Sequence, residues 1–302
     1  GSVLFTGDVN STTPANPPVT GAGTRMMWYP PKGVFRAGTV SSAQWDKSNL
    51  GYYSTAFGND CTASGDYSLS AGGSCSASED YTIALGSHAT ATGQVSTSIG
   101  YYTEASNNCA LATGYLTTAS GNSSAAFNNS TTASGGYSSS FGFQTHATNY
   151  YSFSQGYASD ATGVGSFATG LNTTASGMYS ISSGSNSAAS GMYSFTGGYG
   201  TTAPSLCEFV VGMNNTTYTG NPSSFLTSNR IFVVGNGSSA TDKSNAMVIL
   251  KNGNVGISVD APVYTLAVYG TAAKTGGGNW TNLSDRRLKD IREHIPKVST
   301  KL

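Results

Sequence analysis

The sequence, which is 302 residues long, is poor in charge. Only 9% of its residues are charged, whereas an ordinary soluble domain has about 25%. No Lys or Arg lies between Lys47 and Arg230. That stretch cannot neutralise phosphate groups and offers no basic patch to an anionic membrane surface. We therefore expect neither a nucleic-acid partner nor membrane-surface binding there.

Hydrophobic runs, metal ligands and cofactor motifs are also missing. No run approaches 18 apolar residues, so we expect no membrane-spanning helix. The four cysteines have no Cys-x-x-Cys spacing, and the histidines form no ligand set, so no metal site is expected. No glycine-rich phosphate-binding loop occurs, and we expect no cofactor.

The carboxylates of the central region are too scattered for glycoside hydrolysis, which needs two carboxyl groups about 5–10 Å apart. Between residues 51 and 204 the acids are Asp60, Asp66, Glu79, Asp80, Glu104 and Asp160. Glu79 and Asp80 are adjacent, so on a strand their side chains face opposite ways. We therefore do not expect an enzyme that acts on outside substrates, and a depolymerising enzyme is the weakest of three functional hypotheses.

What the sequence does contain is a 14-residue repeat. Eleven blocks run from Gly51 to Pro204 without an insertion, with the approximate consensus G-x-Y-S-x-A-x-G-x-x-T-T-A-S. Position 13 is Ala in every block, beginning with Ala63, Ala77 and Ala91. Position 8 is Gly in all blocks but one, beginning with Gly58, Gly72 and Gly86. These alanines and glycines are the expected structural residues of the fold.

The repeat predicts short strands and no helices. A Gly in every block would cost a helix about 1 kcal/mol each relative to Ala. Positions 4 to 8 alternate small and large residues, as in residues 54–58, which predicts a five-residue strand. We expect the Gly at position 8 to turn the chain and a second short strand to end near the Ala at position 13. Parallel stacking of such turns gives an all-β parallel β-roll, or solenoid, of roughly 50 Å.

Such a roll is thin, because 14 residues enclose little core, and each turn buries its surface only against its neighbours. The spaced Ser-x-Ala-x-Gly and Ala pattern resembles the head repeats of YadA-like trimeric autotransporter adhesins. This resemblance implies a left-handed roll, a homotrimer of three chains side by side, an extracellular location and a role in surface attachment.

The flanking segments differ from the repeats. Residues 1–50 are rich in proline and contain the apolar cluster Met26 to Tyr29, which indicates a cap for the solenoid or a docking segment. Residues 205–283 predict a degenerate twelfth repeat, in which Gly212 is kept and Thr217 replaces the Ala, followed by a small β domain. This domain contains Asn-Gly-Asn-Val-Gly-Ile at residues 252–257, then Pro262 and Leu-x-Val-x-Gly at residues 266–270. The pattern resembles segments of phage tail fibres and related bacterial surface proteins.

The last segment, residues 284–302, begins with a Ser-Asp-Arg-Arg-Leu-Lys motif and predicts a short helix with Ser284 as its N-cap. The motif also resembles the start of the self-cleaving intramolecular chaperone of endosialidase. This resemblance implies that Ser284 is the nucleophile of a single self-cleavage, that Asp285 follows the cut, and that Lys289 assists proton transfer.

Two further predictions follow from the stacking of equivalent positions in neighbouring repeats. Cys61 and Cys75 share position 11 of adjacent repeats, so a disulfide between them is one expectation and two buried free thiols the other. Tyrosines recur at position 3, as in Tyr53, Tyr67 and Tyr81. We expect them to form a stacked ladder that stabilises the solenoid, or an exposed ladder that binds glycans or matrix polymers.

Three functional hypotheses follow. The first is a trimeric structural and adhesive fibre subunit, with the two unlike ends either capped or joined head to tail in a filament. The second is a phage or viral tail-fibre segment that recognises a host glycan. The third is the depolymerising enzyme. No residue decides between the first and the second.

Overall fold

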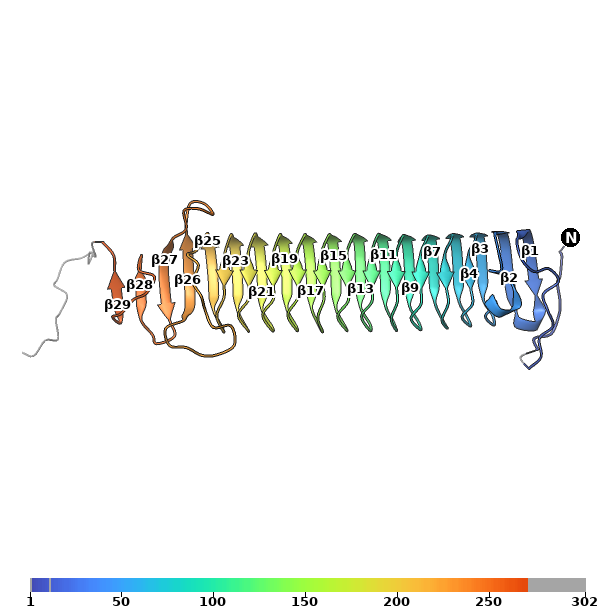
Figure 1. Ribbon diagram of the computed structural model, residues 1–302, viewed down its shortest axis with the longest axis horizontal. Helices are drawn as coiled ribbons and strands as arrows, with labels where there is room; N and C mark the ends of the chain where they lie inside the picture. Colours follow the sequence, from blue (N-terminus) through green and yellow to red (C-terminus); the bar gives the residue numbers. More distant parts are fainter. Residues whose placement is uncertain (1, 11, 271–302) are drawn as a thin grey trace, which may run out of the picture. The chain divides into compact units, whose positions relative to one another are not determined.

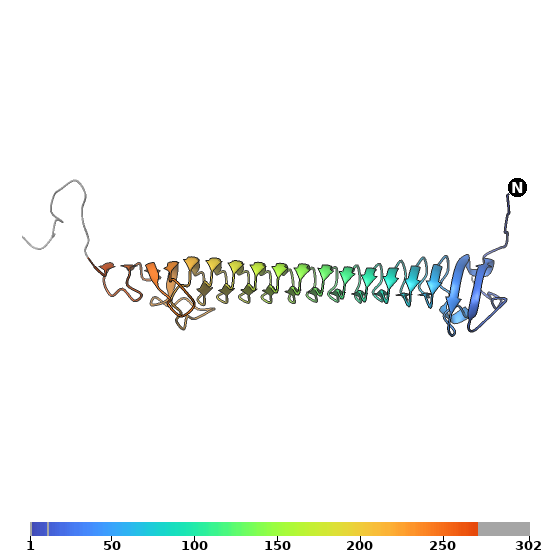
Figure 2. The ribbon, with the colours of Figure 1, turned by 90° about the horizontal axis from the view of Figure 1, so that it is seen from above.

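The computed structural model describes residues 2–10 and 12–270 of the chain, which are all-β, and the repeats among them form a parallel solenoid (Figure 1), as predicted. Within this described part the strands make two sheets, one of 18 strands and one of 11. The described residues up to 267 belong to one compact unit, and the observations below concern this unit, except that β29 runs one residue past it. Seen from above, the two sheets run along the solenoid as two parallel rows (Figure 2).

Each 14-residue repeat forms one turn of the solenoid, called a rung here, with a long and a short strand. The long strands are β3 (Thr55–Asn59), β5 (Leu69–Gly73), β7 (Ile83–Ser87), β9 (Thr97–Tyr101), β11 (Leu111–Tyr115), β13 (Ala125–Asn129), β15 (Ser139–Phe143), β17 (Phe153–Tyr157), β19 (Phe167–Leu171), β21 (Ile181–Ser185) and β23 (Phe195–Tyr199). The short strands are β4 (Thr62–Ala63), β6 (Ser76–Ala77), β8 (Thr90–Ala91), β10 (Glu104–Ala105), β12 (Thr118–Ala119), β14 (Thr132–Ala133), β16 (His146–Ala147), β18 (Asp160–Ala161), β20 (Thr174–Ala175), β22 (Ala188–Ala189) and β24 (Thr202–Ala203).

The corners of each rung differ from the expectation. The long strand occupies positions 5 to 9, so the glycine at position 8 lies inside the strand and does not turn the chain. The chain turns at position 10, where Asp60 and His88 have φ values of 54° and 55°, and again at position 3, where Tyr53 has φ 58°. Each rung therefore has two left-handed corners, mostly occupied by residues other than glycine.

The core between the two sheets is narrow and made of small side chains. Ala56 and Ala63 are fully buried in the first rung, and Ser54 donates a hydrogen bond from its hydroxyl to the carbonyl of Gly51 at 2.6 Å. The same hydroxyl-to-carbonyl bond recurs fourteen residues later from Ser68 to Gly65. Large apolar residues are absent from this part of the core, so the hydrophobic stabilisation per rung is small.

The N-terminal segment closes the first rung. β1 (Gly23–Tyr29) and β2 (Val34–Val40) form an antiparallel hairpin, and β2 stacks parallel on β3. The 3-10 turn η1 (Pro30–Lys32) lies in the connection between the two strands, and the 3-10 turn η2 (Lys47–Asn49) follows β2. The indole of Trp45 is fully buried and donates to the carbonyl of Cys61 at 2.9 Å. Arg36 is also fully buried and donates to the carbonyls of Ser54 and Ala63, each at 2.8 Å.

The solenoid sheet continues beyond the repeats. β25 (Phe209–Met213) forms a twelfth rung, and β24 is the last strand of the short-strand sheet. β26 (Arg230–Asn236) stacks parallel on β25, and β27 (Asn245–Leu250) and β28 (Val255–Ile257) follow antiparallel. β29 (Leu266–Val268) is the last strand described. β26, β27 and β28, which lie in the predicted small β domain, continue the solenoid sheet, and residues 271–283 of that prediction lie outside the described residues.

Candidate interaction surface

The outer face of the long-strand sheet is apolar along most of its length. Positions 5 and 7 of each long strand point away from the core, and no charged residue occupies either position from β3 to β25. Phenylalanines stack on this face between neighbouring rungs. The ring centroids are 4.7 Å apart for Phe127 and Phe141, 4.8 Å for Phe153 and Phe167, and 4.5 Å for Phe195 and Phe209. We call this surface the outer face.

The outer face extends onto the N-terminal hairpin. Trp28 of β1 lies directly opposite Phe35 of β2, and Phe35 is 5.5 Å from Phe57 of the first rung, centroid to centroid. Trp28 is 40% exposed and the neighbouring Met26 is 70% exposed. Together with Leu4 and Phe5 these side chains line a hollow of about 390 Å³. A monomer thus exposes an apolar strip much longer than an isolated surface patch.

Tyrosines at position 3 form ladders along one edge of the outer face. The rings of Tyr53, Tyr67 and Tyr81 stack with centroids 5.1 and 5.0 Å apart, and Tyr179 stacks on Tyr193 at 5.6 Å. The spacing follows the rung spacing of parallel strands. Because the ring faces are used within each ladder, the solvent meets mainly ring edges and hydroxyl groups. This arrangement fits the stabilising role expected from the sequence.

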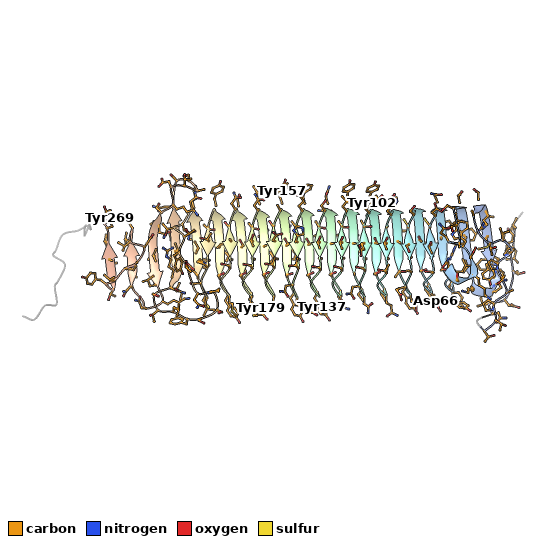
Figure 3. The ribbon with its side chains drawn as sticks, in the orientation of Figure 1. Asp66, Tyr102, Tyr137, Tyr157, Tyr179 and Tyr269 are labelled. Atoms are coloured by element: carbon orange, nitrogen blue, oxygen red, sulfur yellow. The ribbon has the colours of Figure 1, made fainter. Side chains whose placement is uncertain are left out.

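The opposite edge carries a second set of aromatic residues at positions 9 and 10. Figure 3 shows Tyr102 and Tyr157 on this edge, with Asp66, Tyr137 and Tyr179 on the other. Tyr101 stacks on Tyr115 at 5.3 Å, and Phe143 on Tyr157 at 5.1 Å. The sequence analysis did not predict this set. It placed the end of the long strand at the glycine of position 8, before the positions that hold these aromatic residues.

The predicted structural residues lie where the rungs approach most closely. Ala63, Ala77 and Ala91 are fully buried in the short strands and face one another in register. Gly58, Gly72 and Gly86 stack in the long strands, and a Cβ at each would lie 1.8–2.1 Å from the carbonyl oxygen of the next glycine. These glycines are required because the next rung occupies the space of a side chain and because their φ values, 105–125°, are ones that other residues rarely adopt.

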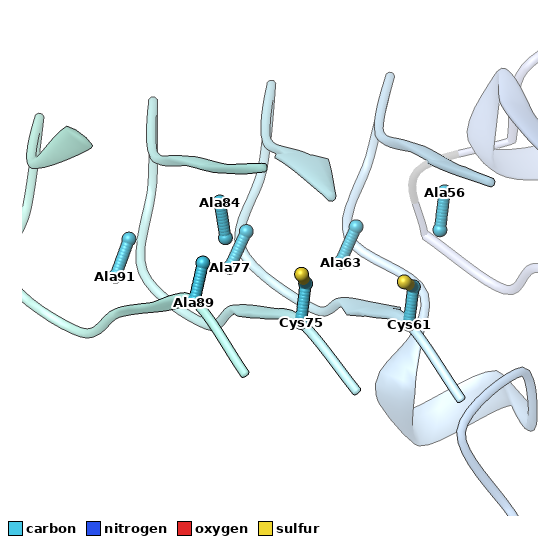
Figure 4. Close-up of a cluster of buried hydrophobic side chains, with 8 residues drawn as sticks. All are labelled: Ala56, Cys61, Ala63, Cys75, Ala77, Ala84, Ala89 and Ala91. Carbon is cyan, nitrogen blue, oxygen red and sulfur yellow. The ribbon is translucent and has the colours of Figure 1, made fainter. Parts of the chain in front are cut away.

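Cys61 and Cys75 lie in the same buried cluster as these alanines (Figure 4). The disulfide considered for them is not formed, and both are free buried thiols. The pKa of the Cys75 thiol is lowered, because the Cys61 thiol forms a hydrogen bond to it. The pKa of the Cys61 thiol is raised by the same contact and by burial. Cys109 and Cys207 are free and exposed at position 3.

A polar cluster at the C-terminal end of the repeats was also missed by the sequence interpretation. Glu208 occupies position 4 of the twelfth rung, where the eleven earlier rungs have Ser, Thr or Ala. Its side chain is fully buried, and burial raises its pKa to about 7. Glu208 differs from the small residues at position 4 of the earlier rungs, and this difference is the sequence signal that could have identified it.

The proposed self-cleavage residues Ser284, Asp285 and Lys289, and the predicted helix of residues 284–302, lie outside the described residues. In the part of the chain that is described, no helix has the length and apolarity needed to cross a membrane.

The family model described as the YadA head domain repeat matches residues 50–74, 77–107, 161–187 and 175–195. These matches all lie within or directly beside the solenoid turns, and they support an adhesin-like repeat. No curated protein matches the chain.

Proposed function

We propose that the chain is a subunit of a parallel homotrimeric, extracellular adhesive fibre, in which three solenoids pack through their outer faces. The observation that carries this proposal is the uncharged, phenylalanine-rich outer face. A solenoid core of Ala, Ser and Thr gains little from burial, whereas each Phe buried between chains adds about 1.5–3 kcal/mol. The known trimeric state of proteins with YadA head repeats supports the same arrangement.

The chain composition also supports a binding role without external catalysis. The acids of the repeats are few, only Glu79 and Asp80 share a rung, and the exposed surfaces are aromatic edges and hydroxyl groups. Such surfaces suit glycans or matrix polymers as partners. They suit catalysis poorly, because catalysis needs convergent titratable groups.

The trimer is tested by placing a charge on the outer face. Phe167→Glu puts a carboxylate between Phe153 and Ile181, where three chains would otherwise exclude water. Thr132→Glu is the matched control, because it adds the same charge to the opposite, short-strand face beside Thr118 and His146.

Light scattering of the wild type and of the control should give a mass near three times 30.8 kDa. Phe167→Glu should shift the mass toward one chain with its β-sheet circular dichroism retained. A wild-type mass of one chain would refute the trimer.

Adhesion is tested with beads that carry the wild-type protein. We expect them to be retained on matrix-coated or glycan-coated surfaces, whereas beads with the Phe167→Glu variant are not. Retention only on bacterial cells, abolished by removing their surface polysaccharide, would instead favour the tail-fibre alternative.

A further inference from the structure

The C-terminal end of the repeats contains a buried carboxyl group in place of a small side chain. In the twelfth rung the short strand is absent, so the core beside β25 has no second sheet to close it. Glu208 fills this space and is fully buried. Residues 214–229, which connect β25 to β26, cover the opening and are called the closing loop here.

Hydrogen bonds join the carboxyl group to the closing loop. One carboxyl oxygen, Oε2, accepts from the backbone N–H of Ser205 and from the hydroxyl of Tyr218, both at 3.0 Å. The Tyr218 oxygen in turn accepts from the backbone N–H of Arg230 at 3.1 Å. The other carboxyl oxygen, Oε1, has no hydrogen-bond partner within the described residues. An ionised carboxylate with one unpartnered oxygen is costly to bury.

The surrounding charges compensate for only part of that cost, because burial raises the pKa of Glu208 more than Arg230 lowers it. The guanidinium of Arg230 donates to the carbonyl and hydroxyl of Thr216, lies 3.6 Å from Asp260 and covers the Tyr218 ring. Lys251 reaches the hydroxyl of Ser205 at 3.4 Å and makes no ion pair with Glu208. The remaining titratable group nearby is the thiol of Cys207, the preceding residue.

Further contacts hold the closing loop against the last rungs. The backbone N–H of Met192 donates to the carbonyl of Pro222 at 2.8 Å, and that of Leu206 donates to the carbonyl of Asn221 at 3.0 Å. The loop therefore satisfies backbone donors of two rungs as well as covering Glu208. Its release would uncover those donors together with the carboxyl group.

We propose that Glu208, Ser205 and Tyr218 form a proton-controlled latch that holds the closing loop over the end of the solenoid when Glu208 is neutral and releases it when Glu208 is ionised. The direction follows from solvation. Opening the loop gives the carboxylate access to water, so ionisation favours the open form. The raised pKa of Glu208 places this change near neutral pH.

Amide hydrogen exchange of the full-length protein tests the latch, with protection expressed relative to the chemical exchange rate at the same pH. Protection of residues 214–229 in the wild type should fall at least tenfold between pH 5.5 and pH 8.5. Protection of β13 and β15, far from the latch, should not change.

Two variants separate the latch from general pH effects. Glu208→Gln keeps an acceptor oxygen but cannot ionise, so its loop should stay protected at both pH values. Tyr218→Phe removes the hydroxyl that bridges Glu208 and Arg230, so its loop should be poorly protected already at pH 5.5. Constant protection in the wild type, or the same pH dependence in Glu208→Gln, would overturn the proposal. If Glu208→Gln does not fold, the Tyr218→Phe result and the wild-type pH series still decide it.

Discussion

Tyr67 and Tyr81 stack face to face across adjacent rungs, with ring centroids 5.0 Å apart and ring planes 1° from parallel. Both residues have left-handed backbones, with φ values of 57° and 59°. A left-handed conformation costs an L-residue about 1–2 kcal/mol. The ladder thus places its aromatic rings on corners where glycine would be less strained. Gly165 occupies the equivalent corner of another rung with φ 62°.

The first prediction separates these two effects at Tyr67. Tyr67→Ala loses the stacks on Tyr53 and Tyr81 and keeps the backbone strain, so the free energy of unfolding should fall by about 1–3 kcal/mol. Tyr67→Gly loses the same stacks but relieves the strain, so its stability should stay close to that of the wild type. Urea unfolding followed by circular dichroism measures both. Equal losses in the two variants would show that the strain contributes nothing.

The second prediction concerns the glycine stack. Gly86 has φ 125°, and a Cβ there would lie 2.1 Å from the carbonyl oxygen of Gly100. The backbone of Gly86 and the carbonyl of Gly100 belong to paired strands, so neither can move apart without breaking the pairing. Gly86→Ala should therefore destabilise the protein by more than about 3 kcal/mol. Gly73→Ala is the control, since a Cβ at Gly73 meets nothing within 4 Å. A thermal melt compares the two, and similar midpoints would contradict the close-approach argument.

The period of the sequence was enough to predict the all-β parallel solenoid, because every rung must repeat the same backbone path. The corners could not be located in the same way. Glycine at position 8 suggested a turn, but it is required by the approach of the next rung, and the chain turns at residues such as Asp60 and Tyr53. Composition cannot show that a glycine such as Gly86 combines a positive φ inside a strand with a close approach to the next rung.

The sequence predicts some of the functional surfaces and not others, depending on how closely their residues follow the repeat. The ladder that includes Tyr53 follows from one repeated position, so the sequence indicates it directly. The outer face mixes Phe, Leu, Ile and Thr at two positions and becomes apparent only when the rungs are stacked. Glu208 accepts a hydrogen bond from Tyr218, which lies in a loop without a repeat and in turn accepts one from Arg230, so the burial of Glu208 could not be inferred from the period.

The third prediction concerns the four thiols. Cys109 and Cys207 are exposed and should react with a maleimide in the native protein, whereas Cys61 and Cys75 are buried and should not. After unfolding without a reductant, intact mass should show four modified thiols, because the structure has no disulfide between Cys61 and Cys75. Only two modified thiols after unfolding would show that the rung-to-rung disulfide forms in the purified protein.

The fourth prediction is the pH dependence of stability that Glu208 produces. Burial raises the pKa of Glu208 from 4.5 to about 7, so the folded protein holds a proton that the unfolded chain has lost between these values. Stability therefore falls as pH rises from about 4.5 to 7 and is constant on either side of this window as far as this group is concerned. The full effect is about 3 kcal/mol at most, since each pKa unit corresponds to about 1.4 kcal/mol.

Thermal melts from pH 4 to pH 8.5 should show this decline in stability in the wild type. In Glu208→Gln the Glu208-dependent part should disappear, which raises the melting temperature relative to the wild type at pH 8.5. A decline of the same size in both proteins would assign the pH dependence to other groups.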